Sequence, residues 1–254
     1  MTAPAMFDLS GLRAVVTGAN TGIGQGIALA LAEAGATVVG VGRSSMDDTA
    51  ARIADVGGRF QAVQADLSAP MAAAGVLDDI AAGHGPVDVL VNNAGIIRRA
   101  EAVDFTEADW DAVMDLNLKS VFFAAQALAR RAIAENRPAK IINIASMLSF
   151  QGGIRVASYT ASKSGVAGLT KLLACEWAGK GINVNALAPG YVETNNTEAL
   201  RKDQERSSDI LKRIPAGRWA RPDDMGGAAV FLASRAADYV HGITLPVDGG
   251  WLAR

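Results

Sequence analysis

The segment Thr17-Gly18-Ala19-Asn20-Thr21-Gly22-Ile23-Gly24 places three glycines between a short apolar run and a helical pattern. Residues 12–17 are apolar enough for a buried strand, and Ile23, Ile27 and Leu31 recur at helical spacing. Glycines let a backbone turn sharply and approach a ligand, and the N-terminus of the next helix offers free N–H groups to a phosphate. A plain turn would also contain glycines, but their position between strand and helix favours a dinucleotide-binding loop.

The alternation of strand and helix continues from this loop to the end of the chain. Strands are expected at residues 12–17, 37–41, 59–64, 87–91, 140–145, 182–187 and 243–247. Several of these runs are almost continuously apolar, as in parallel strands that helices cover on both faces. We therefore predict an α/β fold: a single-domain, Rossmann-like, doubly wound sheet of about seven parallel strands, with helices on both faces. One domain is expected to span residues 1–254, because no repeat or Pro-, Gly- or Ser-rich linker divides the chain.

Composition excludes several classes of function. The 254 residues are 50% hydrophobic and 20% charged, and their formal net charge of −2 gives no positive excess for binding nucleic acid. No apolar run approaches the roughly 18 residues of a membrane span, and no signal peptide is evident, so we expect a cytoplasmic protein without a membrane partner. The single cysteine, Cys175, excludes disulfides within the chain, and neither His84 nor His241 has the spacing of a metal ligand. We expect no metal.

Residues 193–218 differ from the rest of the chain because they are polar and charged, with Asn195-Asn196 near their start. A small helix is expected within them. We interpret this segment as a substrate lid beside the site.

The spacing Thr-Gly-x-x-x-Gly-x-Gly resembles the glycine loop of the short-chain dehydrogenase/reductase family, and five further motifs follow in that family's order. They are Asn92-Asn93-Ala94-Gly95 after the fourth strand, Asn117 in the next helix, Ser146 after the fifth strand, Tyr159-Thr160-Ala161-Ser162-Lys163, and Pro189-Gly190 followed by Thr194. These ordered matches cover essentially the whole chain. The resemblance implies an NAD(P)-dependent oxidoreductase that acts on CH–OH groups.

Tyr159 and Lys163 are four residues apart, so a helix places both side chains on one face. An ammonium group beside a phenol stabilises the phenolate, so we expect Lys163 to lower the pKa of Tyr159 from about 10. Such a pair alone is usually a surface feature, but Ser146 follows a strand, where open α/β sheets bind ligands. The resemblance implies that Ser146 orients the substrate oxygen, Tyr159 is the general acid or base, Lys163 also binds the nicotinamide ribose, and Asn117 supports a water-linked proton relay.

We expect the residues at the end of the second strand, Gly42-Arg43-Ser44-Ser45, to determine whether the cofactor carries a 2′-phosphate. A carboxylate there would exclude a 2′-phosphate, whereas Arg43 can pair with one, which favours NADP(H) slightly. NAD(H) stays open, because the branch of the family considered next is commonly associated with it. The residues expected to bind the cofactor are Gly18, Asn20, Thr21, Gly22, Ile23, Gly24, Arg43, Asp66, Leu67, Asn93, Ala94, Gly95, Tyr159, Lys163, Pro189, Gly190, Val192 and Thr194.

Longer stretches resemble the branch of the family that acts on deoxy sugar acids, of the 2-dehydro-3-deoxy-D-gluconate or 2-deoxy-D-gluconate type. They are residues 92–99, 145–155, 194–197, 213–219 and 248–254. A carboxylate substrate favours a guanidinium group within bidentate reach. We therefore hypothesise that at least one of Arg98, Arg155 and Arg218 binds it. The other expected substrate contacts are Met147, Gln151 and Asn195.

Two alternative functions stay open. A 3-oxoacyl thioester reductase would share the catalytic residues, although a slightly acidic chain suits an acidic acyl carrier poorly. A non-catalytic NAD(P)-sensing regulator would not need to retain Ser146, Tyr159 and Lys163 together. The family resemblance also implies a homotetramer, in which Trp251-Leu252-Ala253 would pack either across a subunit boundary or on its own core.

Overall fold

The computed structural model describes residues 5–69 and 71–254 and contains one seven-stranded parallel sheet. Along the sheet the strand order is β3-β2-β1-β4-β5-β6-β7. The strands are β1 (Arg13–Thr17), β2 (Thr37–Gly42), β3 (Arg59–Gln64), β4 (Val89–Asn92), β5 (Ala139–Ile144), β6 (Ile182–Pro189) and β7 (Thr244–Val247). The predicted doubly wound sheet is confirmed, and every strand boundary lies within two residues of the expected one.

The order of the strands predicts a ligand site at the carboxyl ends of β1 and β4, in the middle of the sheet. The chain first moves outward from β1 to β2 and β3, and then returns so that β4 pairs with β1 on its other side. Open parallel sheets bind ligands at the carboxyl ends of the strands where the order reverses in this way. The glycine loop follows β1 and Asn93 follows β4, so both lie at this point.

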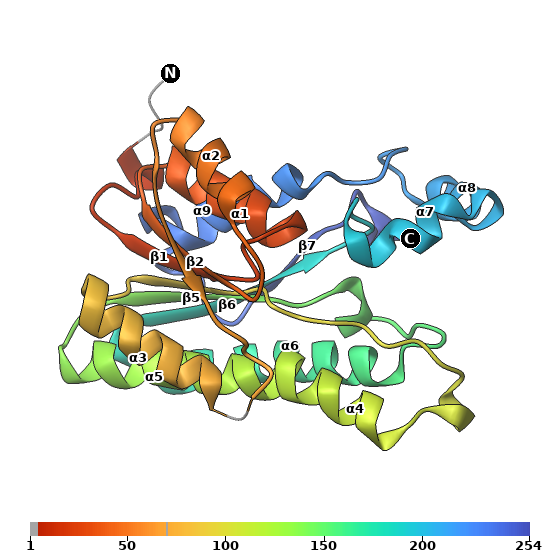
Figure 1. The fold of residues 1–254 in the computed structure, drawn as a ribbon, viewed down its shortest axis with the longest axis horizontal. Coiled ribbons are helices and arrows are strands. Elements are labelled where there is room, and N and C mark those ends of the chain that lie inside the picture. The colour runs from red at the N-terminus through yellow and green to blue at the C-terminus, as the bar shows by residue number, and fades with distance from the viewer. Residues whose placement is uncertain (1–4, 70) are drawn as a thin grey trace.

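Helices cover both faces of the sheet (Figure 1). One layer contains α1 (Gly22–Glu33), α2 (Asp47–Asp55) and α9 (Gly226–Ala233). The other layer contains α3 (Ala72–His84), α4 (Glu107–Met114), α5 (Ser120–Ala134) and α6 (Ala157–Trp177).

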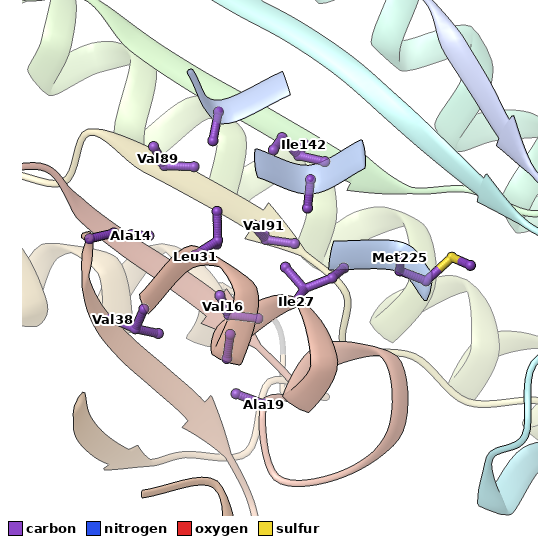
Figure 2. Packing of buried hydrophobic residues seen from close by; sticks show 14 of the residues in the cluster. Ala14, Val16, Ala19, Ile27, Leu31, Val38, Val89, Val91, Ile142 and Met225 are labelled. Atoms are coloured by element: carbon purple, nitrogen blue, oxygen red, sulfur yellow. The ribbon is translucent and has the colours of Figure 1, made fainter. Parts of the chain in front are cut away.

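Two apolar layers fill the spaces between sheet and helices. In the first, Ile27 and Leu31 of α1 and Met225 pack on Val16 and Val91 of the sheet, as Figure 2 shows. Each of these five side chains is fully buried. The helical spacing of Ile27 and Leu31 is therefore the spacing of a core-facing stripe.

The polar segment 193–218 contains more structure than the single small helix that we expected. A short 3₁₀ turn (Asn195–Thr197) leads into α7 (Glu198–Lys202) and α8 (Gln204–Arg213). Both helices extend beyond the sheet at the end where the chain's C-terminus lies (Figure 1).

Among residues 5–69 and 71–254, no helix is long and apolar enough to cross a membrane. The same residues contain no cluster of three His, Cys, Asp or Glu side chains placed to hold a metal ion.

Candidate active site

A cleft of about 640 Å³ opens at the carboxyl ends of β1, β2, β4 and β5. Its volume suits a small organic ligand, since such sites span roughly 300–1,000 Å³. Most of the residues that we expected to bind a cofactor line it: Gly18, Asn20, Thr21, Gly22, Ile23, Gly24, Arg43, Asp66, Leu67, Asn93, Ala94, Gly95, Tyr159, Lys163 and Thr194. Three do not. Pro189 ends β6, Gly190 packs against Asp248, and Val192 is buried in the core behind the cleft.

The glycine loop lines the cleft with backbone, because Gly18, Gly22 and Gly24 place no side chain there. Gly22 has a φ of +57°, and a Cβ there would lie 3.1 Å from the Thr194 methyl group across the cleft. No side chain of the described residues caps the N-terminus of α1, so its first N–H groups are free to bind a phosphate. The loop therefore fits the pyrophosphate of a dinucleotide.

Thr17 and Asn93 hold this loop in place. The Thr17 hydroxyl accepts hydrogen bonds from the backbone N–H groups of Asn93 and Ala94, both at 2.9 Å. The Asn93 amide donates to the carbonyl oxygens of Thr17 at 2.8 Å and Gly18 at 3.2 Å. These bonds tie the loop after β1 to the loop after β4, so the phosphate-binding backbone is fixed in advance of any ligand.

Arg43 and Asp66 lie at the outer end of the cleft, after β2 and β3. Arg43 Nη1 is 3.9 Å from Asp66 Oδ2, and both side chains are more than half exposed. Hydrogen bonds from Ser68 keep the pKa of Asp66 below its ordinary value, with a smaller contribution from the Arg43 charge. An exposed ion pair at this distance is weak, so Arg43 is free to turn toward a phosphate. Ser44 lies beside it, with its hydroxyl accepting a hydrogen bond from Asn20 at 2.8 Å.

Tyr159 and Lys163 belong to α6 and line the same cleft. The Lys163 ammonium donates to the carbonyl oxygen of Ile144 and lies 5.6 Å from the centre of the Tyr159 ring. Burial lowers the pKa of Lys163 to about 8. Lys163 is therefore a buried cation held between the end of β5 and the phenol.

The pKa of Tyr159 is raised, chiefly because the phenol is buried. The Ser146 hydroxyl and the charge of Arg99 act in the opposite direction without outweighing burial. Our expectation that Lys163 would lower the pKa of Tyr159 is wrong, because burial raises that pKa. Sequence spacing predicts which groups meet, but the sign of the shift depends on how completely water is excluded.

Ser146 caps the short 3₁₀ turn Met147–Ser149 that follows β5. Its hydroxyl accepts a hydrogen bond from the Leu148 N–H at 3.2 Å, and the residue is 7% exposed. That bond occupies one lone pair of the hydroxyl and leaves its proton available. Ser146 can thus donate to an oxygen atom held near Tyr159.

Asn117 lies in a π-helical turn (Asp115–Lys119) between α4 and α5. Such turns are rare and often occur at functional sites. The fully buried side chain bonds both backbone groups of Ile96, accepting from its N–H and donating to its carbonyl, each at 2.9 Å. Asn117 therefore fixes the loop after β4. Its part in a proton relay stays a prediction.

The three arginines proposed to bind a carboxylate each bond an acidic residue instead. Arg98 lies 3.1 Å from Asp109 and Arg155 lies 3.3 Å from Glu101. Arg218 holds Asp224 through two bonds, of 2.6 and 2.8 Å, that lower the pKa of Asp224 to about 2. Among the described residues, none of these arginines lines the cleft.

The remaining expected substrate residues differ in position. Asn195 lines the cleft. Met147 lies in a buried apolar cluster with Ile210, and the Gln151 amide oxygen accepts a hydrogen bond from the Trp251 indole.

Sequence reasoning overlooked Arg99 and Asn196. The Arg99 guanidinium donates to the Asn196 carbonyl at 3.0 Å, and Asn196 lines the cleft. Arg99 is close enough to the Tyr159 phenol for its charge to affect the pKa there. Within the described chain it forms no ion pair. The doublet Arg98-Arg99 was the available signal, but only Arg98 was expected to bind the carboxylate.

Known proteins resemble this chain over nearly its whole length. A family model of the short-chain dehydrogenase type, described as "Enoyl-(Acyl carrier protein) reductase", matches residues 18–252. The chain belongs to the short-chain dehydrogenase/reductase family. This membership confirms the predicted family and an oxidoreductase that acts on a hydroxyl group.

Relatives of this dehydrogenase include sugar-acid enzymes. The 2-dehydro-3-deoxy-D-gluconate 5-dehydrogenase of Dickeya dadantii is 58% identical over 248 residues, which cover 98% of each chain. A solved structure from Agrobacterium tumefaciens, named as a 2-deoxy-D-gluconate 3-dehydrogenase with bound NADP, is 61% identical. It superposes with a TM-score of 0.95 and covers 99% of this chain and 100% of that one. The 3-oxoacyl-[acyl-carrier-protein] reductase of Salmonella typhimurium is more distant, at 40% identity over 96% of this chain and 98% of its own.

Proposed function

We propose that this dehydrogenase transfers a hydride between NADP(H) and a keto or hydroxyl group of a deoxy sugar acid of the 2-dehydro-3-deoxy-D-gluconate type. One observation carries the proposal: a single cleft is lined by both the glycine loop and the Tyr159–Lys163 pair. The substrate class is supported by the 58% identity with the 5-dehydrogenase over nearly all of both chains. The more distant thioester reductase is the second candidate.

The cofactor site is proposed from residues that suit each part of NADP(H). Its pyrophosphate would lie on the glycine loop, and its 2′-phosphate would meet Arg43 and Ser44, since a guanidinium group binds phosphate with two parallel hydrogen bonds. The nicotinamide ribose would lie beside Lys163. When bound, the nicotinamide supplies or takes up the hydride.

Tyr159 would transfer the proton. Its phenol would donate a proton to the carbonyl oxygen during reduction and take it back from the alcohol during oxidation. The Ser146 hydroxyl would bond the same substrate oxygen and fix it for transfer. Lys163, held by the Ile144 carbonyl, places a positive charge 5.6 Å from the phenol ring, where it stabilises the developing phenolate.

Arg99 is the proposed partner of the substrate carboxylate. Its guanidinium is near Tyr159 and bonded to the lid backbone at Asn196, so it can hold an acid whose other end reaches Ser146 and Tyr159. An Arg99→Ala enzyme should show a KM for the sugar acid raised by about 10- to 100-fold, the value of a charge-assisted hydrogen bond. Cofactor affinity should not change.

Arg98→Ala is the matched control, since it removes a neighbouring guanidinium that pairs with Asp109 at the surface. Steady-state kinetics should show a normal KM for this control. Equal KM values for the Arg99→Ala enzyme and the native enzyme would show that the carboxylate binds elsewhere.

An initial-rate assay tests the function as a whole. The keto-deoxy acid, its reduced form and an acetoacetyl thioester are each paired with NADPH, NADH and their oxidised forms, and nicotinamide absorbance is followed. We expect turnover of the sugar acid with a preference for the phosphorylated cofactor. Turnover of the thioester alone would favour the second candidate, and a strong preference for NADH would argue against the role of Arg43.

Three further expectations remain proposals. Residues 193–218 act as a lid on a single catalytic domain of residues 1–254, and Asn195 and Asn196 of this segment line the cleft. The enzyme works in the cytoplasm. It assembles as a homotetramer, as the family resemblance implies.

A further inference from the structure

The two hydroxyl groups of the proposed active site belong to different segments of the chain. Ser146 precedes the 3₁₀ turn Met147–Ser149 that follows β5, whereas Tyr159 lies in α6. The Ser146 hydroxyl is close enough to the phenol to lower the pKa of Tyr159, although burial outweighs this effect. In the proposed function both groups bond one substrate oxygen, and a misplacement of about 1 Å can cost roughly 100-fold in rate. The contacts between the turn and α6 therefore determine how well the two groups converge.

Lys163 of α6 is bonded to both ends of the segment that carries Ser146. Its ammonium group donates to the carbonyl oxygen of Ile144 at the end of β5. Its backbone carbonyl accepts a hydrogen bond from the Ser149 hydroxyl at 2.6 Å. Ser146 lies between these two anchors, so one residue of the helix contacts the segment on either side of it.

The two ends of this segment are held to different extents. At the near end, the Ala145 N–H also bonds the Leu187 carbonyl of β6 at 2.7 Å, so the sheet fixes that end. At the far end, the exposed Ser164 of α6 also donates to the Leu148 carbonyl of the turn, but at 3.4 Å. A bond of that length is weak beside the 2.6 Å bond of the half-buried Ser149. Ser149 is therefore the main directional link between the turn and α6 in the described part of the chain.

The turn itself couples Ser149 to Ser146. The Ser149 N–H donates to the Ser146 carbonyl at 2.9 Å, and the Leu148 N–H donates to the Ser146 hydroxyl at 3.2 Å. A shift of Ser149 is thus passed on to the hydroxyl that faces the substrate oxygen. Met147 packs on the apolar cluster that contains Ile210, but such packing is non-directional and does not set the orientation of a hydroxyl group.

We propose that Ser149 is a positioning residue for catalysis: its hydroxyl fastens the turn to α6, so that Ser146 and Tyr159 meet the same substrate oxygen. This inference rests on the proposed function for the reaction that the two hydroxyl groups perform. Among the described residues, Ser149 is not one of those that line the cleft, so it acts through Ser146 and not by touching the substrate or the cofactor.

Four proteins test the coupling: the native enzyme, Ser149→Ala, Ser146→Ala and the double variant. We expect Ser149→Ala to lower kcat by about 10-fold, the value of one lost hydrogen bond, with the NADPH Kd and the melting temperature unchanged. In the Ser146→Ala background the same change should alter kcat by less than about twofold, because no Ser146 hydroxyl is left to position. Single-turnover rates at high enzyme concentration keep the slow variants measurable. Effects on kcat that multiply independently would overturn the proposal, as would a native kcat for Ser149→Ala.

Ser149→Thr is a second variant, which keeps the hydroxyl group that the proposal requires. Threonine can donate to the Lys163 carbonyl as serine does, so kcat should stay within about twofold of native. This variant decides the question even if Ser149→Ala failed to fold. A folded threonine enzyme that lost about 10-fold in kcat would overturn the proposal, because the bond to α6 would then not be what matters.

Ser234→Ala is the matched control. Ser234 is buried at the end of α9, and its hydroxyl donates to the Phe231 carbonyl at 2.9 Å. The substitution removes the same kind of bond outside the site, so kcat should be native, and a loss equal to that of Ser149→Ala would contradict a specific role for Ser149.

The failure of the proposed function can be distinguished from the failure of this inference. If the native enzyme reduced only the thioester, the proposed substrate class would fail. The same four proteins would then decide this inference on the thioester, because coupling in kcat between Ser149 and Ser146 supports the positioning role and independence contradicts it.

Discussion

The Tyr159→Phe enzyme should lose about a thousandfold in kcat while still binding NADPH normally, because general acid–base catalysis by one positioned group contributes roughly 10²–10⁴-fold. The change removes one oxygen atom and keeps the ring over which the Lys163 ammonium lies at 5.6 Å. Folding and the cofactor end of the cleft should therefore be unaffected. Single-turnover rates with the sugar acid and a fluorescence titration with NADPH would measure the two quantities separately.

Tyr239→Phe makes the same chemical change at a fully exposed tyrosine and should leave kcat unchanged. A Tyr159→Phe enzyme that kept more than about a tenth of native activity would exclude the phenol as the general acid, given the contribution expected of such a group.

The pH dependence of the native enzyme should have opposite signs in the two directions. Burial raises the pKa of Tyr159, so the phenol keeps its proton at neutral pH. Reduction uses that proton, so its kcat/KM should be flat through neutral pH and fall as pH rises through the pKa. Oxidation needs the phenolate, so its kcat/KM should rise with pH until the same pKa is reached. Profiles of the same sign in both directions would contradict this assignment.

The fold was predictable because the decisive signals are local. Residues 12–35 contain a strand, a glycine loop and a helix with its end signal, and the apolar runs that follow lie at or within two residues of the observed strands. Tyr159 and Lys163 could be paired for the same reason, since one turn of helix brings them together. Local spacing does not determine how deeply such a pair is buried, which explains why the direction of the Tyr159 pKa shift was predicted wrongly.

The substrate end of the cleft could not be predicted, because its contacts join segments far apart in sequence. Arg99 meets Asn196 across 97 positions, and Gln151 meets Trp251 across 100. Arg98 and Arg99 have the same chemistry in the sequence, and only the packed structure shows that Arg98 pairs with Asp109 whereas Arg99 donates to the Asn196 carbonyl. Residues 193–218 are mostly polar or charged and exposed, and Ile210 and Ile214 are the buried apolar residues among them, so most side chains of this segment have no apolar contact that fixes where they lie.

Gly24→Ala should weaken NADPH binding by about 100-fold or more, because the added methyl group clashes with the Gly18 carbonyl and the Asn93 side-chain amide. A Cβ at position 24 would lie 2.2 Å from the Gly18 carbonyl oxygen and 2.4 Å from the Asn93 amide nitrogen. Neither can move aside easily, because the Gly18 N–H bonds the Val41 carbonyl at 2.7 Å and the Asn93 amide bonds Thr17 at 2.8 Å. The loop must therefore open, and its phosphate-binding N–H groups move out of position. Isothermal titration with NADPH would measure the loss.

Gly75→Ala separates this effect from the general consequence of replacing a helical glycine. Gly75 lies in α3 and a Cβ there would meet no atom within 4 Å, so alanine should leave NADPH binding unchanged and stabilise the helix by up to about 1 kcal/mol. Both substitutions add a methyl group to a helix, but only the one at Gly24 places it against other atoms of the protein. If both variants bound NADPH with native affinity, the prediction would be contradicted. The close approach of Gly24 to Gly18 would then not contribute to cofactor binding.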